Sequence, residues 1–152
     1  MVLVRSLSPR IRLPLDRLRR VARLTLNALG SSGADLHLMC VDDRAIRSLN
    51  RRFLGKNRST DVLAFEADEA GNVPLLGEIV ISWETARRQA KRLGHSLEEE
   101  LSLMTIHGLL HLVGYDDTDP TEARLMHERE RSLFVKCVGK PSPTLWNGLL
   151  PA

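Results

Sequence analysis

Apolar residues recur along this chain at two spacings, and the spacings predict a series of strands and helices. Residues 35–41 alternate between apolar and polar positions, as a half-buried strand does, and residues 2–5 are predicted as a first strand. Between them, residues 14–30 place apolar side chains at every third or fourth position, the spacing of one helix face. Pro14 is typical of a first helical turn and Gly30 of a helix end, so we expect the first helix between them.

Helix caps, glycines and polar loops divide the rest of the chain into further elements. In chain order these are a helix from Asp42 or Asp43 to Gly55, a polar loop over 56–60, strands over 62–66 and 78–82 joined as a hairpin, a helix from Ser82 to Gly94, and two helices that begin at the capping boxes 96–99 and 119–122. The order β-α-β-α-β-β-α-α-α predicts an α/β (α+β) fold, in which a small mixed sheet packs with about five helices. We assign residues 1–138 to a single domain and residues 139–152, which contain three prolines, to an irregular tail with Trp146 as its candidate anchor.

The composition is that of an ordinary globular domain. The chain has 152 residues, of which 43% are apolar and 27% charged, and no apolar run is long enough to cross a bilayer. The N-terminus lacks the apolar core and cleavage site of a signal peptide, so we expect a cytoplasmic protein without a membrane partner. Cys40 and Cys137 form no Cys-x-x-Cys pair and are expected to be buried thiols, not a disulfide.

Charge is distributed unevenly along the chain. Residues 1–95 hold 17 Lys/Arg and 10 Asp/Glu, a balance of +7, whereas residues 96–152 hold 5 and 9, a balance of −4. The N-terminal part therefore suits a polyanion such as a nucleic acid, although arginines on solvated helix faces would give the same count. His37 falls on the polar face of the strand 35–41 and is expected at the surface.

One segment carries the clearest chemistry. His107 and His111 stand four residues apart in a run predicted as helix, so both imidazoles point to the same side. Gly114 can adopt the left-handed conformation that ends a helix, and carboxylates follow at once. Spacing selects Asp117 as the third ligand. The result is an N,N,O site with one position open, which is the layout of a catalytic zinc centre.

The third ligand has alternatives, and one familiar catalytic group is missing. Asp116, Asp119 and His127 are the other candidate ligands nearby. Position 108 is glycine, where metalloproteases of the His-Glu-x-x-His type carry the glutamate that acts as general base. In a hydrolase with this site, the metal itself, an outer carboxylate or the substrate must activate water. The missing glutamate disfavours a peptidase and leaves room for phosphodiester chemistry.

Four motifs along the chain occur in an order and spacing that point to one family. They are Leu49-Asn50 with Phe53-x-Gly55-Lys56, then Thr60-Asp61-Val62-Leu63-x-Phe65, then Leu76-Gly77-Glu78-Ile79-Val80-Ile81-Ser82, and finally the run from His107 to Asp116 with Gly114 and Tyr115. Together they cover roughly residues 35–135, and the sequence resembles the YbeY family of bacterial rRNA maturation factors.

The resemblance implies a function and a set of partners. Members of this family are regarded as metal-dependent endoribonucleases that act on single-stranded RNA in 16S rRNA 3′-end maturation and ribosome quality control. His107 and His111 match the family's first two zinc ligands, whereas Asp117 stands where a histidine is usual. The implied partners are single-stranded RNA, 16S rRNA, the ribosomal small subunit and its assembly proteins.

A second departure from the family concerns substrate binding. Leu54 occupies a position where the family commonly has an arginine that is thought to matter for RNA cleavage. Four cations flank this position and are predicted to bind phosphates in its place, although they cannot all reproduce its geometry: Arg51, Arg52, Lys56 and Arg58.

The sequence alone does not decide which metal ion is bound or which reaction is catalysed. We expect one Zn²⁺ per chain, with Mn²⁺ as a competitor because an aspartate ligand makes the site harder and more anionic. Asp116 is expected either to orient a ligand or to cap the turn. Two other functions stay open: a metallohydrolase, such as a peptidase, acting on another substrate, and a non-catalytic assembly factor with structural zinc. Leu54 favours the second, and a site with only three protein ligands disfavours it.

Overall fold

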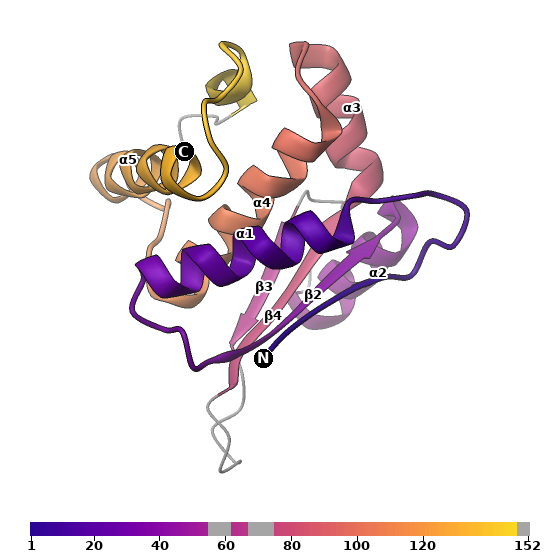
Figure 1. The fold of residues 1–152 in the computed structure, drawn as a ribbon. Coiled ribbons are helices and arrows are strands. Elements are labelled where there is room, and N and C mark those ends of the chain that lie inside the picture. Colours follow the sequence, from indigo (N-terminus) through magenta and orange to yellow (C-terminus); the bar gives the residue numbers. More distant parts are fainter. Residues whose placement is uncertain (55–61, 67–74, 149–152) are drawn as a thin grey trace.

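The computed structural model describes residues 1–54, 62–66 and 75–148, and shows a four-stranded sheet with five α-helices (Figure 1). In chain order the elements are β1 (Val2–Ser6), α1 (Leu15–Ala28), β2 (Asp35–Val41), α2 (Asp43–Leu54), β3 (Val62–Glu66), β4 (Leu75–Ser82), α3 (Trp83–Leu93), α4 (Leu97–Leu112), α5 (Pro120–Cys137) and the short 3-10 helix η1 (Leu145–Gly148). The predicted order of strands and helices is confirmed, with η1 added. No helix in the described ranges is both long enough and apolar enough to span a membrane.

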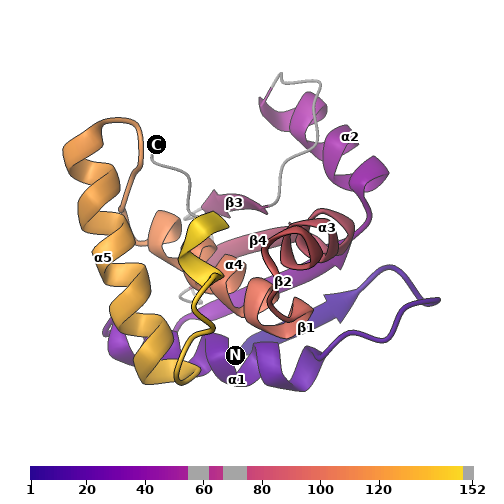
Figure 2. The same ribbon diagram turned by 90° about the horizontal axis from the view of Figure 1, so that it is seen from above.

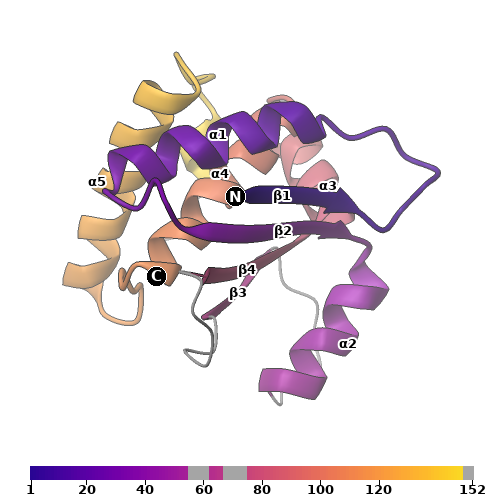
Figure 3. The same cartoon turned by 60° about the horizontal axis from the view of Figure 1, so that its bottom comes forward.

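The sheet is mixed, with the strand order β1-β2-β4-β3 (Figure 3). β1, β2 and β4 run parallel, whereas β3 pairs antiparallel with β4, so that Glu66 lies opposite Gly77. The predicted pairing of residues 62–66 with 78–82 is confirmed, but β4 begins earlier, at Leu75. Gly77 interrupts the apolar alternation of this strand, which is why the pattern places its start at Glu78 instead.

Different helices cover the two faces of the sheet, because successive strand residues point to opposite sides. Ile79 and Ile81 of β4 face the main core, which α1 and α4 cover, whereas Val80 packs in a smaller cluster with Ile46 of α2. α2 therefore lies on the opposite face of the sheet from α4 (Figure 1).

The two cysteines are buried and free, as the sequence predicts. Cys40 lies in the main core, and burial raises the pKa of its thiol to about 12. A thiol with so high a pKa stays neutral at physiological pH, so it packs as a small apolar side chain and does not act as a nucleophile.

α4 is the central helix of the molecule, in contact with α1, α3, α5, β3 and β4. Its capping box is confirmed: the Ser96 hydroxyl accepts the Glu99 N–H at 3.0 Å, and the Glu99 carboxylate accepts the Ser96 N–H. α5 packs along its outer side and buries Met126, Leu133 and Phe134 there (Figure 2). Packing on several sides fixes the position of every side chain that α4 carries.

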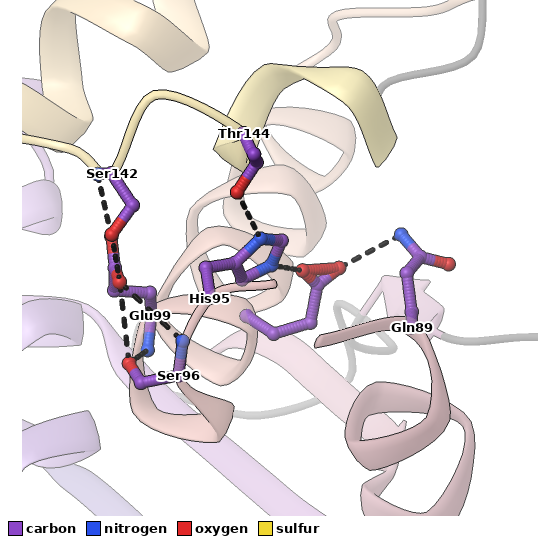
Figure 4. Close-up of polar contacts among 7 residues, drawn as sticks. Gln89, His95, Ser96, Glu99, Ser142 and Thr144 are labelled. Carbon is purple, nitrogen blue, oxygen red and sulfur yellow. Dashed lines mark hydrogen bonds and ion pairs between the residues drawn. The ribbon is translucent and has the colours of Figure 1, made fainter. Parts of the chain in front are cut away.

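The segment after α5 folds back onto the body of the protein (Figure 4). The Ser142 N–H and hydroxyl donate to Glu99 at 2.8 and 2.6 Å. Leu145 is fully buried, and the Trp146 ring meets Phe134 edge-on with the ring centroids 5.6 Å apart. The expected contact of Trp146 with the body is confirmed, but the segment is not wholly irregular, because it contains η1.

Candidate metal centre

The C-terminal half of α4 presents two histidines on one side. His107 and His111 are about one helical turn apart, and beyond the helix Gly114 adopts a φ of +107°, which reverses the chain. The reversal brings Asp117 back, so that one ligand atom from each of these three residues lies within 4.8 Å of the others. Across residues 1–54, 62–66 and 75–148, this is the one group of three or more His, Cys, Asp or Glu residues that could hold a metal ion.

Hydrogen bonds at the Nδ1 atoms orient both imidazoles. His107 Nδ1 donates to a carboxylate oxygen of Glu130 on α5, and His111 Nδ1 donates to the Tyr115 carbonyl at 3.1 Å. A carbonyl and an ionised carboxylate can only accept hydrogen bonds, so each ring keeps its proton on Nδ1. When both rings are neutral, their Nε2 atoms are therefore unprotonated, and these two atoms face each other at a separation of 3.0 Å.

This arrangement fits a metal ion. Two facing nitrogen lone pairs repel unless a cation lies between them, and in a tetrahedral zinc site two histidine nitrogens are about 3.3 Å apart, close to the separation seen here. Asp117 Oδ2 lies 3.9 Å from His111 Nε2. The side chains of His107, His111 and Asp117 are 20%, 28% and 38% exposed, so an ion held by them would keep one side open to solvent.

The electrostatic surroundings favour a neutral imidazole at His111. Burial lowers the pKa of His111, and the neighbouring His107 lowers it further, against weaker opposing effects that include the carboxylate of Asp117. The lowered pKa keeps the ring neutral near neutral pH, with its single proton on Nδ1. This is the form in which histidine binds a metal.

The other candidate ligands make different contacts. The Asp116 carboxylate accepts the N–H of the next residue at 2.7 Å and the Thr118 hydroxyl at 3.3 Å, which corresponds to the turn-capping alternative. Asp119 caps α5 by accepting a first-turn N–H at 2.9 Å. His127 lies on α5 and does not belong to the three-residue group.

Gly108, next to the first ligand, faces the sheet. A Cβ at this position would lie 2.9, 3.0 and 3.2 Å from three atoms of the Ile79 side chain on β4. α4 thus approaches the sheet more closely than a larger residue would permit. A glutamate has no space at position 108 in this packing, so the general base of the His-Glu-x-x-His peptidases has no counterpart here.

Two of the four predicted phosphate-binding residues, Arg51 and Arg52, lie in the described part of the chain. Arg51 and Arg52 are exposed at the C-terminal end of α2, on the opposite face of the sheet from α4. Lys56 and Arg58 lie outside the described residues. Contact of these four cations with RNA phosphates therefore stays a prediction.

Sequence reasoning missed the groups that orient the two histidines. Glu130 is fully buried and occupies the apolar stripe of α5, between Met126 and Leu133. A carboxylate at a stripe position is a signal in the sequence, because ionised side chains are almost never fully buried without a partner. Tyr115 acts through its backbone carbonyl, so no side-chain pattern marks its role.

Fold and site together define a mixed α/β domain with a two-histidine, one-aspartate candidate metal centre at the end of its central helix. A family model described as Endoribonuclease YbeY matches residues 9–137. An Endoribonuclease YbeY from Aquifex aeolicus (strain VF5) is 44% identical over 123 residues, which cover 80% of this chain and 82% of the relative. Another from Anaeromyxobacter sp. (strain Fw109-5) is 45% identical over 126 residues, which cover 82% of this chain and 66% of the relative.

The chain therefore belongs to the Endoribonuclease YbeY family, and this membership supports an endoribonuclease role. The resemblance found in the sequence motifs is confirmed. The fold is also similar to the solution structure of TM1509 from Thermotoga maritima, with a TM-score of 0.62 and 23% sequence identity over 97% of this chain and 91% of that one.

Proposed function

We propose that this protein is a metal-dependent endoribonuclease that cleaves single-stranded RNA in 16S rRNA 3′-end maturation and ribosome quality control. The proposal is carried by the two facing Nε2 atoms of His107 and His111, with Asp117 beside them, in a member of an endoribonuclease family. Three protein ligands leave one coordination position for water or substrate. Three protein ligands are typical of a catalytic zinc site, whereas structural zinc normally has four.

Each residue of the candidate site has a separate role in holding a divalent metal ion. A divalent ion held here would supply Lewis-acid chemistry, lowering the pKa of water or polarising a phosphoryl oxygen. His107 and His111 bind through Nε2, and their Nδ1 hydrogen bonds keep these atoms unprotonated. Asp117 adds a negative charge where the family usually has a neutral histidine, so we expect Zn²⁺ to be the bound ion and Mn²⁺ to compete for the site.

RNA recognition is proposed to rest on the phosphate backbone. Aromatic residues are only 4% of the chain, so base stacking is expected to contribute little. Four cations that flank Leu54 in the sequence are proposed to hold phosphates and to compensate in part for the missing arginine: Arg51, Arg52, Lys56 and Arg58. The proposed partners are 16S rRNA, the ribosomal small subunit and its assembly proteins, in the cytoplasm.

Two alternative functions are less well supported by the residues present. Gly108 packs against Ile79 and leaves no space for the glutamate of a His-Glu-x-x-His peptidase, which disfavours peptide hydrolysis. A non-catalytic assembly factor is favoured by one observation, Leu54 in place of the family's usual arginine.

Cleavage of a single-stranded RNA that carries a 16S 3′-end sequence tests the proposal. Zinc-loaded wild-type protein is expected to cut it, whereas His111→Ala and Asp117→Ala are expected to abolish cleavage while keeping the wild-type circular dichroism spectrum. His127→Ala is the matched control and is expected to cleave normally. If the wild type does not cut, even with ribosomal small subunits added, the assembly-factor function replaces this proposal. Elemental analysis after growth with both zinc and manganese identifies the bound metal.

A further inference from the structure

Glu130 stands out among the side chains of α5 because it is charged and fully buried. It lies at 0% exposure in the interface between α4 and α5, on the same stripe as Met126 and Leu133. One of its carboxylate oxygens accepts from His107 Nδ1, and the other has no hydrogen-bond partner among the described residues. Burial of a carboxylate is costly, and an apolar side chain would fill this position more cheaply. Helix packing alone therefore gives no reason for a glutamate here.

We propose that Glu130 is a positioning residue for the metal ligand His107, an inference that rests on the metal site of the proposed function. By accepting the Nδ1 proton, Glu130 fixes the tautomer in which Nε2 carries the lone pair, and it holds the ring in the plane that aims Nε2 at the site. A carboxylate partner also makes the imidazole a stronger ligand than a neutral acceptor would.

The two histidines are supported unequally. His111 Nδ1 donates to the backbone carbonyl of Tyr115, which is neutral, whereas His107 Nδ1 donates to a carboxylate. Glu130 adds a buried negative charge to those of Asp117 and Asp116, which act on His111. It does so without occupying a coordination position.

The test measures zinc affinity in the absence of RNA. Metal-stripped protein is titrated with Zn²⁺ against a chromophoric chelator, for the wild type and for Glu130→Gln. Glutamine has nearly the same size and can still accept a hydrogen bond, but it has no charge. We expect the dissociation constant for zinc to rise about 10- to 100-fold. The matched control is Glu128→Gln, which removes the same charge from the exposed face of α5 and is expected to change the constant by less than about twofold.

A second readout separates positioning from a general effect on folding. Long-range proton–nitrogen NMR of the metal-free protein reports which nitrogen of His107 carries the proton. We expect the Nδ1–H tautomer in the wild type and a shift toward the Nε2–H tautomer in Glu130→Ala. If Glu130→Gln does not fold, Glu130→Asp, which keeps the charge but withdraws it by one methylene, takes its place and is expected to weaken zinc binding as well.

The outcomes distinguish this inference from the proposed function. Wild-type zinc affinity in a folded Glu130→Gln, or an unchanged tautomer in Glu130→Ala, would overturn the inference and leave the metal site standing. Failure of the wild type to bind zinc at all would overturn the metal site and the inference together. Zinc binding that depends on Glu130, without RNA cleavage, would support the inference and count against the nuclease.

Discussion

Two histidine–glutamate pairs lie near the two ends of α4, and they differ in how completely the protein surrounds them. At the amino end, His95 Nε2 lies 2.7 Å from Glu100 and His95 Nδ1 lies 3.3 Å from the Thr144 hydroxyl, while Gln89 donates to the other Glu100 oxygen at 2.8 Å (Figure 4). The His95 and Glu100 side chains are 0% and 1% exposed. Both ring nitrogens and both carboxylate oxygens of this pair thus have partners within the protein.

The pair at the carboxyl end is left open on one side. His107 meets Glu130 through Nδ1, but its Nε2 is directed at His111 within a partly exposed group. The comparison teaches that residue type alone does not separate a structural histidine from a ligand. A pair with both nitrogens satisfied stabilises the fold, whereas a pair that directs one nitrogen toward other ligands can bind a metal.

Substitution of the histidine in each pair is expected to give the largest difference between the two pairs, and the quantity that differs is the metal content. His107→Ala is expected to lower the metal content from about one ion per chain to nearly none, because two remaining ligands hold zinc poorly. Elemental analysis of the dialysed protein measures this. His95→Gln, which keeps a hydrogen-bond donor near Glu100, is expected to retain the full metal content. Loss of metal from His95→Gln would break the comparison.

Loss of the buried His95–Glu100 pair should instead lower the free energy of unfolding. His95→Ala leaves the buried Glu100 carboxylate without one of its hydrogen-bond partners, and loss of such a partner typically costs about 1–3 kcal/mol. Urea denaturation followed by circular dichroism measures the free energy of unfolding. The control is His37→Ala, whose side chain is 44% exposed and 3.6 Å from Glu78 and which should cost less than about 1 kcal/mol. Equal costs for the two variants would show that His95 has no special role.

A substitution that disturbs the close packing of α4 against the sheet is expected to have an effect on stability that is no larger. Gly108→Ala places a methyl group about 3 Å from Ile79, and overpacking of this kind typically costs about 1–3 kcal/mol. Chemical denaturation measures the loss. Gly108→Ala with Ile79→Val provides the check, because a smaller side chain on β4 should recover part of the stability. A stability of Gly108→Ala equal to that of the wild type would mean that α4 shifts away from the sheet at little cost.

The smallest effect concerns the pH dependence of the tail's attachment. Burial tends to raise the pKa of Glu99, but hydrogen bonds from Ser142 and Ser96 outweigh it, so the folded-state pKa lies below its ordinary value. A carboxyl with a lowered folded pKa contributes stability above its unfolded pKa and loses it as the pH falls through the folded pKa. The wild type should thus lose stability as the pH falls below the ordinary pKa of a glutamate, about 4.3, and Glu99→Gln should lose less over the same range. Parallel stability–pH curves for the two proteins would contradict this.

Local signals account for most of what the sequence predicted correctly. The Ser96 capping box, the left-handed Gly94 and the turn at Gly114 each depend on neighbours within a few residues, so the bounds of α3 and α4 follow from the chain itself. The same holds for His107 and His111, whose common direction is a consequence of helical spacing.

Contacts between distant segments account for what was missed. Glu130 reaches His107 from a different helix, and His95 Nδ1 contacts the hydroxyl of Thr144, which lies 49 residues along the chain. No spacing rule connects such positions, because their approach depends on how α4, α5 and the tail pack. The placement of Arg51 on the opposite face of the sheet from α4 also follows from packing and not from the local pattern of α2.

The contact between Gly108 and Ile79 also limits the substitutions by which this fold can acquire new chemistry. The residue beside the first histidine is pressed against β4, so a mutation that introduced a glutamate there would first need a smaller side chain at position 79 and a helix moved outward. An outward shift of α4 would also move the candidate ligands His107 and His111, which this helix carries. A substitution at Asp117, the candidate third ligand on the loop after α4, therefore meets far fewer packing constraints than a glutamate at position 108 would.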